Sequence, residues 1–428
     1  MIKVQVLTAK HAYLRRYKKH IALNLSYFLA RRISFKSKRT FSKLIVRIAI
    51  VGIALGLGIM ILTLAILKGF KQEIREKIRG FSGDMMVLKY DLNNSYENSP
   101  FKNDSTFLIK AKSNPYINKV MPFATKPGII KANGEIEGVL LKGVDKTYDW
   151  TFFKKSLRSG TVLNFGDSTE VKKQLLISQT IANSLKLKVG DKIIMYFIQE
   201  PIRRRQFVIK GIFNFGIEDV DKSYVIGDIS LITRLNNWNP DEVGGYEIKI
   251  NNFNKLRETE EIVNGLLPTK LKSYTVTDTY PAIFSWLDLL DGNTNVVLGL
   301  MIIVAVINMI SALLIMILER TNFIGIIKAM GARNWVIQKI FLYNAIYLIA
   351  IGMLIGNIWG FGFGLLQQQT HFFKLKEATY YMSFVPIQFD IGDWIFLNAG
   401  TAFICILVML GPSMLVTKIT PVKAIRFK

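Results

Sequence analysis

Four long apolar runs constrain the fold of this chain more than any other feature of its sequence. They cover residues 48–67, 296–318, 340–366 and 394–416. None of these runs contains an Asp, Glu, Lys or Arg side chain. Each is long enough to cross a bilayer core as a helix, which takes about 20 apolar residues. The expected membrane-spanning helices are residues 44–67, 291–318, 340–366 and 393–416.

The charges between the runs predict the orientation of the chain in the membrane. Residues 1–43 hold twelve Lys or Arg and no Asp or Glu. Together with Arg47 and the segments 319–339 and 417–428, they hold 21 basic residues against one acidic residue. Basic residues concentrate in the cytoplasmic segments of membrane proteins. We therefore expect both termini and residues 319–339 in the cytoplasm, with 417–428 as a cytoplasmic tail. The segments expected on the opposite side are 68–290 and 367–392.

The formal net charge of +25 would also suit a nucleic-acid-binding protein. That class needs a basic face on a folded domain. Most of the excess positive charge here lies instead in the segments expected in the cytoplasm, so we expect no nucleic-acid partner.

Within residues 1–43, Ile21, Leu25, Phe28 and Leu29 recur at helical spacing between basic clusters. This pattern favours an amphipathic helix on the inner membrane surface, and a basic tail without regular structure is the alternative.

Residues 68–290 are long enough for one or two folded domains. They alternate β-branched, turn-punctuated stretches such as EIEGVLLKGV with helix-like ones such as NKLRETEEIVNGLL, so we expect an α+β domain. The predicted fold class is therefore an α-helical membrane protein with four transmembrane helices and a large α+β extracytoplasmic domain.

Two helices are expected to project from the membrane as stalks at the ends of this domain. Apolar residues recur at helical spacing from Leu67 to Ile78 and again from Ile283 to Leu290. A helix from Pro281 to Glu319 would be about 58 Å long at ~1.5 Å per residue, although Gly292 could interrupt it. Such rods would carry movement across the membrane, and ordinary docking of the domain is the alternative.

The sequence offers no catalytic or metal-binding constellation. Its single cysteine, Cys405, lies in the fourth apolar run, and its three histidines are scattered. The phosphate-binding pattern G-x-x-x-x-G-K-[ST] does not occur. We therefore expect a non-catalytic chain that binds no cofactor itself, with any ATP and Mg²⁺ held by a separate chain.

The segment 319–339 connects the second and third runs. Phe323, Ile326, Ile327 and Met330 form an apolar stripe at helical spacing, and Gly331 follows as a stop. A short amphipathic helix here can rest on the lipid surface. It can equally insert into a cleft on a partner protein, where burying each such side chain contributes about 1.5 to 3 kcal/mol.

These residues resemble a known family. ERTNFIGIIKAMGARN is similar to the cytoplasmic coupling segment of the FtsX-like ABC permeases, and ITPVKAIRFK is similar to their C-terminal motif. The resemblance implies that this segment contacts a separate cytoplasmic ABC ATPase dimer. The coupling residues it implies are Glu319, Arg320, Phe323, Ile324, Gly325, Ile327, Lys328, Met330 and Gly331.

Within that superfamily the chain looks most like the lipoprotein-releasing, Lol-type permeases of the bacterial inner membrane. The similarity is carried by GVLLKGVD, by ISQTIANSLKLKVGDKI and by YYMSFVPIQFD. It implies a permease subunit that works beside a second permease, the same chain or a homologous one. The complex would couple ATP hydrolysis to the release of lipoproteins from the inner membrane to a periplasmic carrier.

The stretch EPIRRRQF, residues 200–207, lies between two strand-like runs. In the Lol-type family a protruding hairpin at this position of one subunit hooks the carrier. The residues that this resemblance assigns to a hook are Pro201, Ile202, Arg203, Arg204 and Arg205. An ordinary β-hairpin with a basic turn is the alternative, and IRRR is more basic than the family pattern.

Two other functions remain open. One is a mechanotransmission permease of a macrolide-exporter-like efflux pump, although such permeases commonly carry a fused ATPase. The other is a signalling scaffold that controls a cell-wall hydrolase, although its extracytoplasmic loop is usually much shorter.

Glycines at four-residue spacing, from Gly352 to Gly364 and at Gly52 and Gly56, predict close helix packing. Asn308 and Ser311 are expected to face protein.

Overall fold

The computed structural model describes residues 40–91, 96–166 and 170–420. The predicted N-terminal amphipathic helix and most of the C-terminal motif lie outside these residues. The chain divides into two compact units. We call their described residues the helical unit (within 40–69, 289–372 and 386–420) and the α+β unit (within 70–288 and 373–385).

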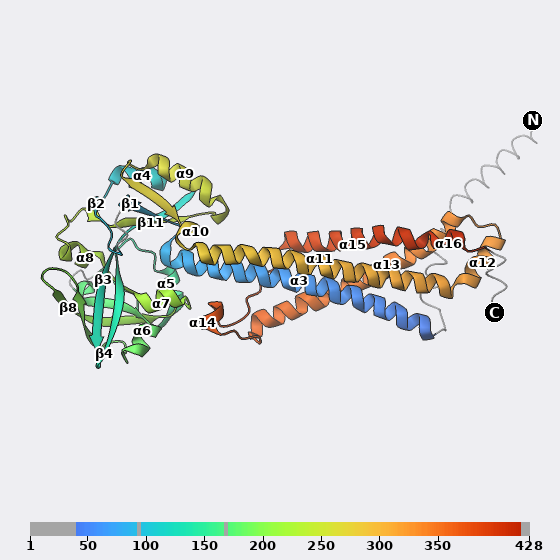
Figure 1. Ribbon diagram of the computed structural model, residues 1–428, viewed down its shortest axis with the longest axis horizontal. Coiled ribbons are helices and arrows are strands. Elements are labelled where there is room, and N and C mark those ends of the chain that lie inside the picture. Colours follow the sequence, from blue (N-terminus) through green and yellow to red (C-terminus); the bar gives the residue numbers. More distant parts are fainter. Residues whose placement is uncertain (1–39, 92–95, 167–169, 421–428) are drawn as a thin grey trace, which may run out of the picture. The chain divides into compact units, whose positions relative to one another are not determined.

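The described part of the chain contains four helices that are long and apolar enough to cross a membrane. They are built on α3 (Thr40–Ser82), α11 (Pro281–Glu319), α13 (Asn334–Thr370) and α15 (Ile391–Ser413) (Figure 1). The four apolar helices predicted from the sequence are thus confirmed. Two short helices accompany them, α12 (Thr321–Ala329) and α16 (Leu415–Lys418).

Both expected stalks continue their spans without a break. α3 extends to Ser82 and α11 begins at Pro281. Gly292 does not interrupt α11, because the residue sits inside an unbroken helix. The amphipathic patterns on either side of the α+β segment therefore belong to the same helices as the apolar runs.

Glycines on α13 let it approach α3 closely within the helical unit. A Cβ atom at Gly356 would lie 2.8 Å from the carbonyl oxygen of Ala54, and one at Gly352 would lie 2.8 Å from the Ile53 Cβ. Gly360 faces Gly58 in the same way. The predicted close packing is confirmed for these glycines, because larger side chains would force the two backbones apart.

The two predicted polar positions on α11 differ in environment. Asn308 is half-buried and fills the space beside Gly52, where an added Cβ would lie 2.7 Å from Asn308 Nδ2. Ser311 is exposed and donates a hydrogen bond to the Ile307 carbonyl of its own helix, 2.8 Å away. Its hydroxyl is satisfied by the backbone of its own helix, and the expectation that Ser311 faces protein stays a prediction for the complex.

The α+β unit is organised around one ten-stranded sheet with the strand order β12-β1-β11-β3-β4-β9-β6-β8-β5, in which β7 joins β3 to β8. The pairing therefore closes into a ring through β3, β4, β9, β6, β8 and β7. The strands are β1 (Met85–Lys89), β3 (Ile117–Ala132), β4 (Glu135–Val144), β5 (Leu157–Gly160), β6 (Gln174–Ser178), β7 (Lys192–Phe197), β8 (Arg203–Phe213), β9 (Tyr224–Asp228), β11 (Gly245–Ile250) and β12 (Leu271–Thr275). A separate pair consists of β2 (Phe101–Lys102) and β10 (Glu242–Val243).

Helices cover this sheet. They are α4 (Ser105–Ser113), α5 (Thr151–Ser156), α6 (Gln179–Ser184), α7 (Glu218–Ser223), α8 (Ile229–Leu235), α9 (Leu256–Leu266) and α10 (Val276–Thr279). One core, which includes the fully buried Leu141, Ile177 and Ile209, is shared by the strands of this ring and by α6 and α8. The remaining elements are the 3-10 helices η1 (Val171–Lys173) and η2 (Phe253–Lys255) and the short α14 (Glu377–Tyr380). The α+β prediction is thus confirmed.

Candidate coupling and docking sites

The predicted coupling segment forms the short helix α12 between α11 and α13. It begins after Arg320, where the chain turns away from the end of α11 at Glu319; both residues are half-buried. It ends at a left-handed glycine, because Gly331 has φ +89°. The Ala332 amide donates to the Ile327 carbonyl over 3.2 Å and so closes the last turn. The predicted stop at Gly331 is confirmed.

The apolar residues of α12 point to two sides, which the sequence did not separate. Ile324, Gly325 and Ile327 are buried, and the two isoleucines belong to the core of the helical unit, against which Phe323 also packs. Ile326 is 52% exposed and Met330 is 73% exposed. The single stripe predicted from Phe323, Ile326, Ile327 and Met330 is therefore wrong. We call Ile326 and Met330, which lie one helical turn apart, the α12 patch.

Lys328 fixes α12 to the far end of the chain. Its ammonium donates to the carbonyl oxygens of Val416 and Ile419 over 2.8 and 2.7 Å. These carbonyls lie at the end of α16, where unpaired acceptors and the helix dipole favour a cation.

Trp335, in the first turn of α13, is 58% exposed, and the Lys339 ammonium lies 5.4 Å from its ring. Sequence reasoning missed Trp335, although an exposed tryptophan beside the coupling motif was a visible signal.

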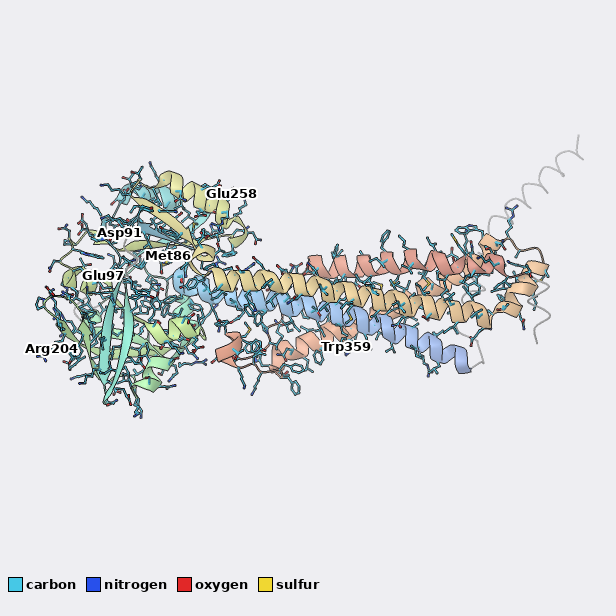
Figure 2. All side chains as sticks on the ribbon, viewed as in Figure 1. Met86, Asp91, Glu97, Arg204, Glu258 and Trp359 are labelled. Carbon is cyan, nitrogen blue, oxygen red and sulfur yellow. The ribbon has the colours of Figure 1, made fainter. Side chains whose placement is uncertain are left out.

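The predicted hook residues lie on the β7–β8 hairpin of the α+β unit. The strands are paired from Lys192 to Phe197, which faces Arg203, and residues 198–202 connect them. Pro201 and Ile202 are thus in the connection, while Arg203, Arg204 and Arg205 begin β8. Arg204 lies at the edge of the α+β unit (Figure 2).

The hairpin connection is tied to α8. Arg203 Nη1 donates to the carbonyl oxygens of Arg234 and Leu235 at 3.3 Å, and Gln199 Nε2 donates to Leu235 at 3.2 Å. These bonds satisfy carbonyls at the C-terminus of the helix. Ile198 and Ile202 remain 71% and 69% exposed. The hairpin therefore presents two apolar side chains on a short, anchored turn.

A basic cavity of about 520 Å³ adjoins the hairpin. It has four cationic side chains and no carboxylate in its lining, which consists of Lys172, Lys173, Arg205, Gln206, Phe207, Leu231, Arg234 and Leu235. Arg205 is a predicted hook residue, but the other three cations come from η1 and α8. Sequence reasoning missed them because only the tertiary fold places these segments beside β8.

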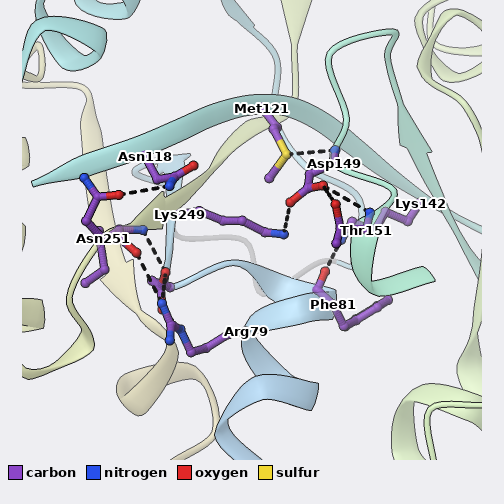
Figure 3. Close-up of polar contacts among 11 residues, drawn as sticks. Arg79, Phe81, Asn118, Met121, Lys142, Asp149, Thr151, Lys249 and Asn251 are labelled. Atoms are coloured by element: carbon purple, nitrogen blue, oxygen red, sulfur yellow. Dashed lines mark hydrogen bonds and ion pairs between the residues drawn. The ribbon is translucent and has the colours of Figure 1, made fainter. Parts of the chain in front are cut away.

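The C-terminal end of α3 is built into the sheet (Figure 3). The Lys142 ammonium on β4 donates to the Phe81 carbonyl and to Glu247 Oε1 on β11, each at 2.5 Å. Arg79 forms an ion pair with Asp84, whose second oxygen accepts from the Ile250 amide at 2.8 Å. Two strands of the sheet thus hold the last turn of α3.

Burial sets the electrostatics of this junction. It lowers the pKa of Lys142 and raises the pKa of Glu247, and the attraction between the two groups opposes both shifts. Burial also tends to raise the pKa of Asp149, but hydrogen bonds from Lys249 and Thr151 outweigh it and hold that pKa well below its usual range.

The described residues contain no group of three or more His, Cys, Asp or Glu that could hold a metal ion.

Four membrane-length helices and a separate, large α+β unit define a multi-span membrane protein with an extramembrane domain. Residues 48–264 match the family of the MacB-like periplasmic core domain, and residues 295–421 match the C-terminal domain of the FtsX-like permeases. The match to the MacB-like periplasmic core domain covers half of the chain, so the chain belongs to that family, and its C-terminal part is similar to the FtsX-like permeases.

Lipoprotein-releasing permeases are similar to the chain over nearly its whole length. It is 21% identical to the lipoprotein-releasing system transmembrane protein LolC of Xylella fastidiosa, over 95% of this chain and 98% of that one. It is 23% identical to LolC of Neisseria meningitidis serogroup B, over 92% and 96% of the two chains. It is 22% identical to LolE of Haemophilus influenzae, over 94% and 99%.

Proposed function

We propose that this chain is a permease subunit of an inner-membrane ABC complex that releases lipoproteins to a periplasmic carrier. The observation that carries the proposal is the end-to-end similarity to LolC and LolE proteins, which extends through both units. ATP hydrolysis takes place on a separate ATPase dimer, and a second permease completes the complex. Both termini lie in the cytoplasm.

The α12 patch is the part of this chain that the ATPase contacts. Exposed Ile326 and Met330 enter a cleft on the ATPase, while buried Ile324 and Ile327 fasten α12 to the helical unit. A short helix that is apolar on both sides can receive a push on one side and pass it to the bundle on the other. In this arrangement Lys328 positions α12 rather than contacting the ATPase, because its ammonium already binds the end of α16.

Movement then reaches the α+β unit through the stalk helices α3 and α11. The Lys142–Glu247 pair is suited to this role because Lys142 binds the last turn of α3 and Glu247 holds Lys142 in place from a second strand. A rigid attachment passes on displacement that a flexible linker would absorb. No covalent bond of the lipoprotein changes; the work is extraction of its lipid anchor.

The carrier docks at the β7–β8 hairpin. Exposed Ile198 and Ile202 offer apolar contact, and the basic cavity behind Arg205 favours a carrier surface rich in carboxylates. Complementary charge mainly speeds association and selects the partner. Pro201, Ile202 and the three arginines are therefore proposed as part of a wider docking surface.

A second candidate function is efflux, since half of the chain matches the MacB-like periplasmic core domain. The two functions differ in their partners. We therefore expect affinity purification of the tagged chain from its native membrane, after mild crosslinking, to yield an ATPase, a lipoprotein carrier and lipoproteins. Recovery of an outer-membrane channel and a periplasmic adaptor in place of the carrier would favour efflux instead.

A further inference from the structure

The connection between α13 and α15 belongs to the α+β unit. The chain leaves the helical unit between Phe372 and Phe373 and returns to it between Val385 and Pro386. Its ends are held together, because the Leu375 amide donates to Ser383 O over 2.9 Å and the Val385 amide to Phe373 O over 3.0 Å. We call residues 373–385 the α13–α15 loop. It is a compact, folded connection that contains α14.

Lys77 on α3 joins this loop to the turn that follows β8. Its ammonium donates to the carbonyl oxygen of Phe215 over 2.8 Å and to that of Tyr381 over 2.5 Å. Gly216 makes room for this contact, since it has φ +71° and a Cβ there would lie 3.1 Å from both Lys77 Nζ and Tyr381 O. Three segments that are far apart in the sequence therefore meet at one ammonium group.

Glu377 on α14 makes the second attachment. One carboxylate oxygen lies 3.3 Å from Arg158 Nη2, and the other accepts from Asn214 Nδ2 at 3.2 Å. The receiving turn is held in shape by Asp221, which accepts the amides of Phe215 and Gly216. The docking surface for the loop is therefore fixed by its own hydrogen bonds.

At their other ends, α13 and α15 are joined to α12. Buried residues of α12, α13, α15 and α16 share one core, including Ile324, Ile337, Cys405 and Val416. Along the two long helices, Asn357 Nδ2 donates to Asn398 Oδ1 over 2.7 Å. A displacement of α12 therefore acts on the α13–α15 pair as a group.

We propose that the α13–α15 loop is a second route by which movement of α12 reaches the α+β unit, parallel to the stalk helices. Lys77 and Glu377 are the positioning residues that keep the loop docked while force passes. This inference rests on the proposed coupling of α12 to an ATPase. It goes beyond that function by giving the connection between the last two spans a mechanical task.

The test uses the intact complex with its ATPase in lipid nanodiscs and compares Lys77→Met and Glu377→Arg with the unaltered protein. Lys155→Met and Glu76→Gln are matched controls, because both residues line the same cavity of about 510 Å³ as Lys77 and Glu377. Hydrogen exchange of residues 373–385 reports docking. Spin labels at Ser113 and Ile391 report nucleotide-dependent movement between the two units. ATP hydrolysis and lipoprotein release are measured in parallel.

We expect Lys77→Met and Glu377→Arg to raise exchange in the loop about tenfold or more, since each removes a charge-assisted hydrogen bond. Lipoprotein release and the nucleotide-dependent distance change should both decrease in these two variants. ATP hydrolysis should stay near the wild-type rate, and the two control variants should match the unaltered protein in all four measurements. The reversed pair Arg158→Glu/Glu377→Arg should restore docking and the distance change together, because it restores the attraction between the two positions.

Unaltered distance changes in the undocked variants would overturn the inference, as would a reversed pair that restores docking without restoring movement. An equal loss in the controls would also overturn it. If the unaltered complex moves on nucleotide binding but releases no lipoprotein, the proposed function fails. In that case, a Lys77→Met variant that loses the distance change seen in the unaltered complex still supports the loop as a transmission route.

Discussion

Lys142 and Glu247 form an ion pair, with 2.5 Å between Nζ and Oε1, although their side chains are only 2% and 3% exposed. The same ammonium binds the Phe81 carbonyl at the end of α3. Burying two charges costs more than their attraction returns unless further hydrogen bonds satisfy them. Here the helix terminus supplies such a bond, so the pair joins β4, β11 and α3 at one point.

Removing one member of this pair should destabilise the α+β unit strongly. We expect Lys142→Met to lower the free energy of unfolding by about 3–5 kcal/mol, because it leaves the Glu247 carboxylate buried without its partner. The double variant Lys142→Met/Glu247→Leu should lose much less. Thermal unfolding of the full chain in nanodiscs measures both. Equal losses in the single and double variants would mean that the two charges are not coupled.

Acid sensitivity should depend in part on Asp278. Hydrogen bonds from Arg257 hold the pKa of this carboxyl at about 2, below its ordinary value of 3.8. Its contribution to stability is therefore present above pH 3.8 and is lost as the pH falls towards 2. The pair is exposed, so the loss is under about 1 kcal/mol.

The substitution Asp278→Asn should therefore flatten the fall in melting temperature between pH 5 and pH 2, relative to the unaltered protein. The exposed carboxylate Asp219, replaced by Asn, is the control. A slope that responds equally to both substitutions would contradict the assignment to the Arg257–Asp278 pair.

Close packing of α3 and α13 can be tested with two glycines on the same helix. Gly356→Val places methyl groups against the Ala54 carbonyl, whereas Gly362 has no neighbour within 4 Å of its Cβ position. Overpacking of this kind costs about 1–3 kcal/mol. Gly356→Val should lower the melting temperature of the helical unit, and Gly362→Val should not. Similar melting temperatures for the two variants would contradict this packing.

The two sides of α12 should respond differently to a new charge. Met330→Glu and Ile326→Glu place a carboxylate on the exposed α12 patch, so the chain should fold normally. Stimulation of the ATPase should fall about tenfold to a hundredfold, because each variant loses about 1.5–3 kcal/mol of apolar burial. Ile324→Glu should instead reduce folded protein, because Ile324 is fully buried. Asn322→Glu, on an exposed polar position, is the control. Normal stimulation in both patch variants would assign α12 to the lipid surface.

Some of this architecture could be predicted from sequence because it depends on local periodicity. Four uncharged apolar runs give four helices, and Gly331 marks the end of α12. The two sides of α12 could not be told apart, because Ile324 and Ile326 are equally apolar and only the packing of α16 and α13 decides which is buried.

Contacts between distant segments could not be predicted at all. Lys77 meets Tyr381 and Lys328 meets Val416 through side chains that look like ordinary surface cations in the sequence. The basic cavity likewise needs η1 and α8 beside β8. No local pattern encodes which strand or loop a lysine will reach, so the docking of the α13–α15 loop is visible only in the fold.

Release of a lipoprotein is the most direct measurement of the central claim. The complex, purified with its ATPase, is reconstituted with fluorescently labelled lipoprotein, and transfer to soluble carrier is followed after ATP is added. We expect ATP-dependent transfer. Met330→Glu should reduce it at least about tenfold by weakening contact with the ATPase, and the charge reversal Arg205→Glu should weaken it while ATP hydrolysis continues. Lys146→Glu, on an exposed position outside the basic cavity, should transfer normally. A complex that hydrolyses ATP yet leaves all the lipoprotein in the membrane, with carrier present, would contradict the account.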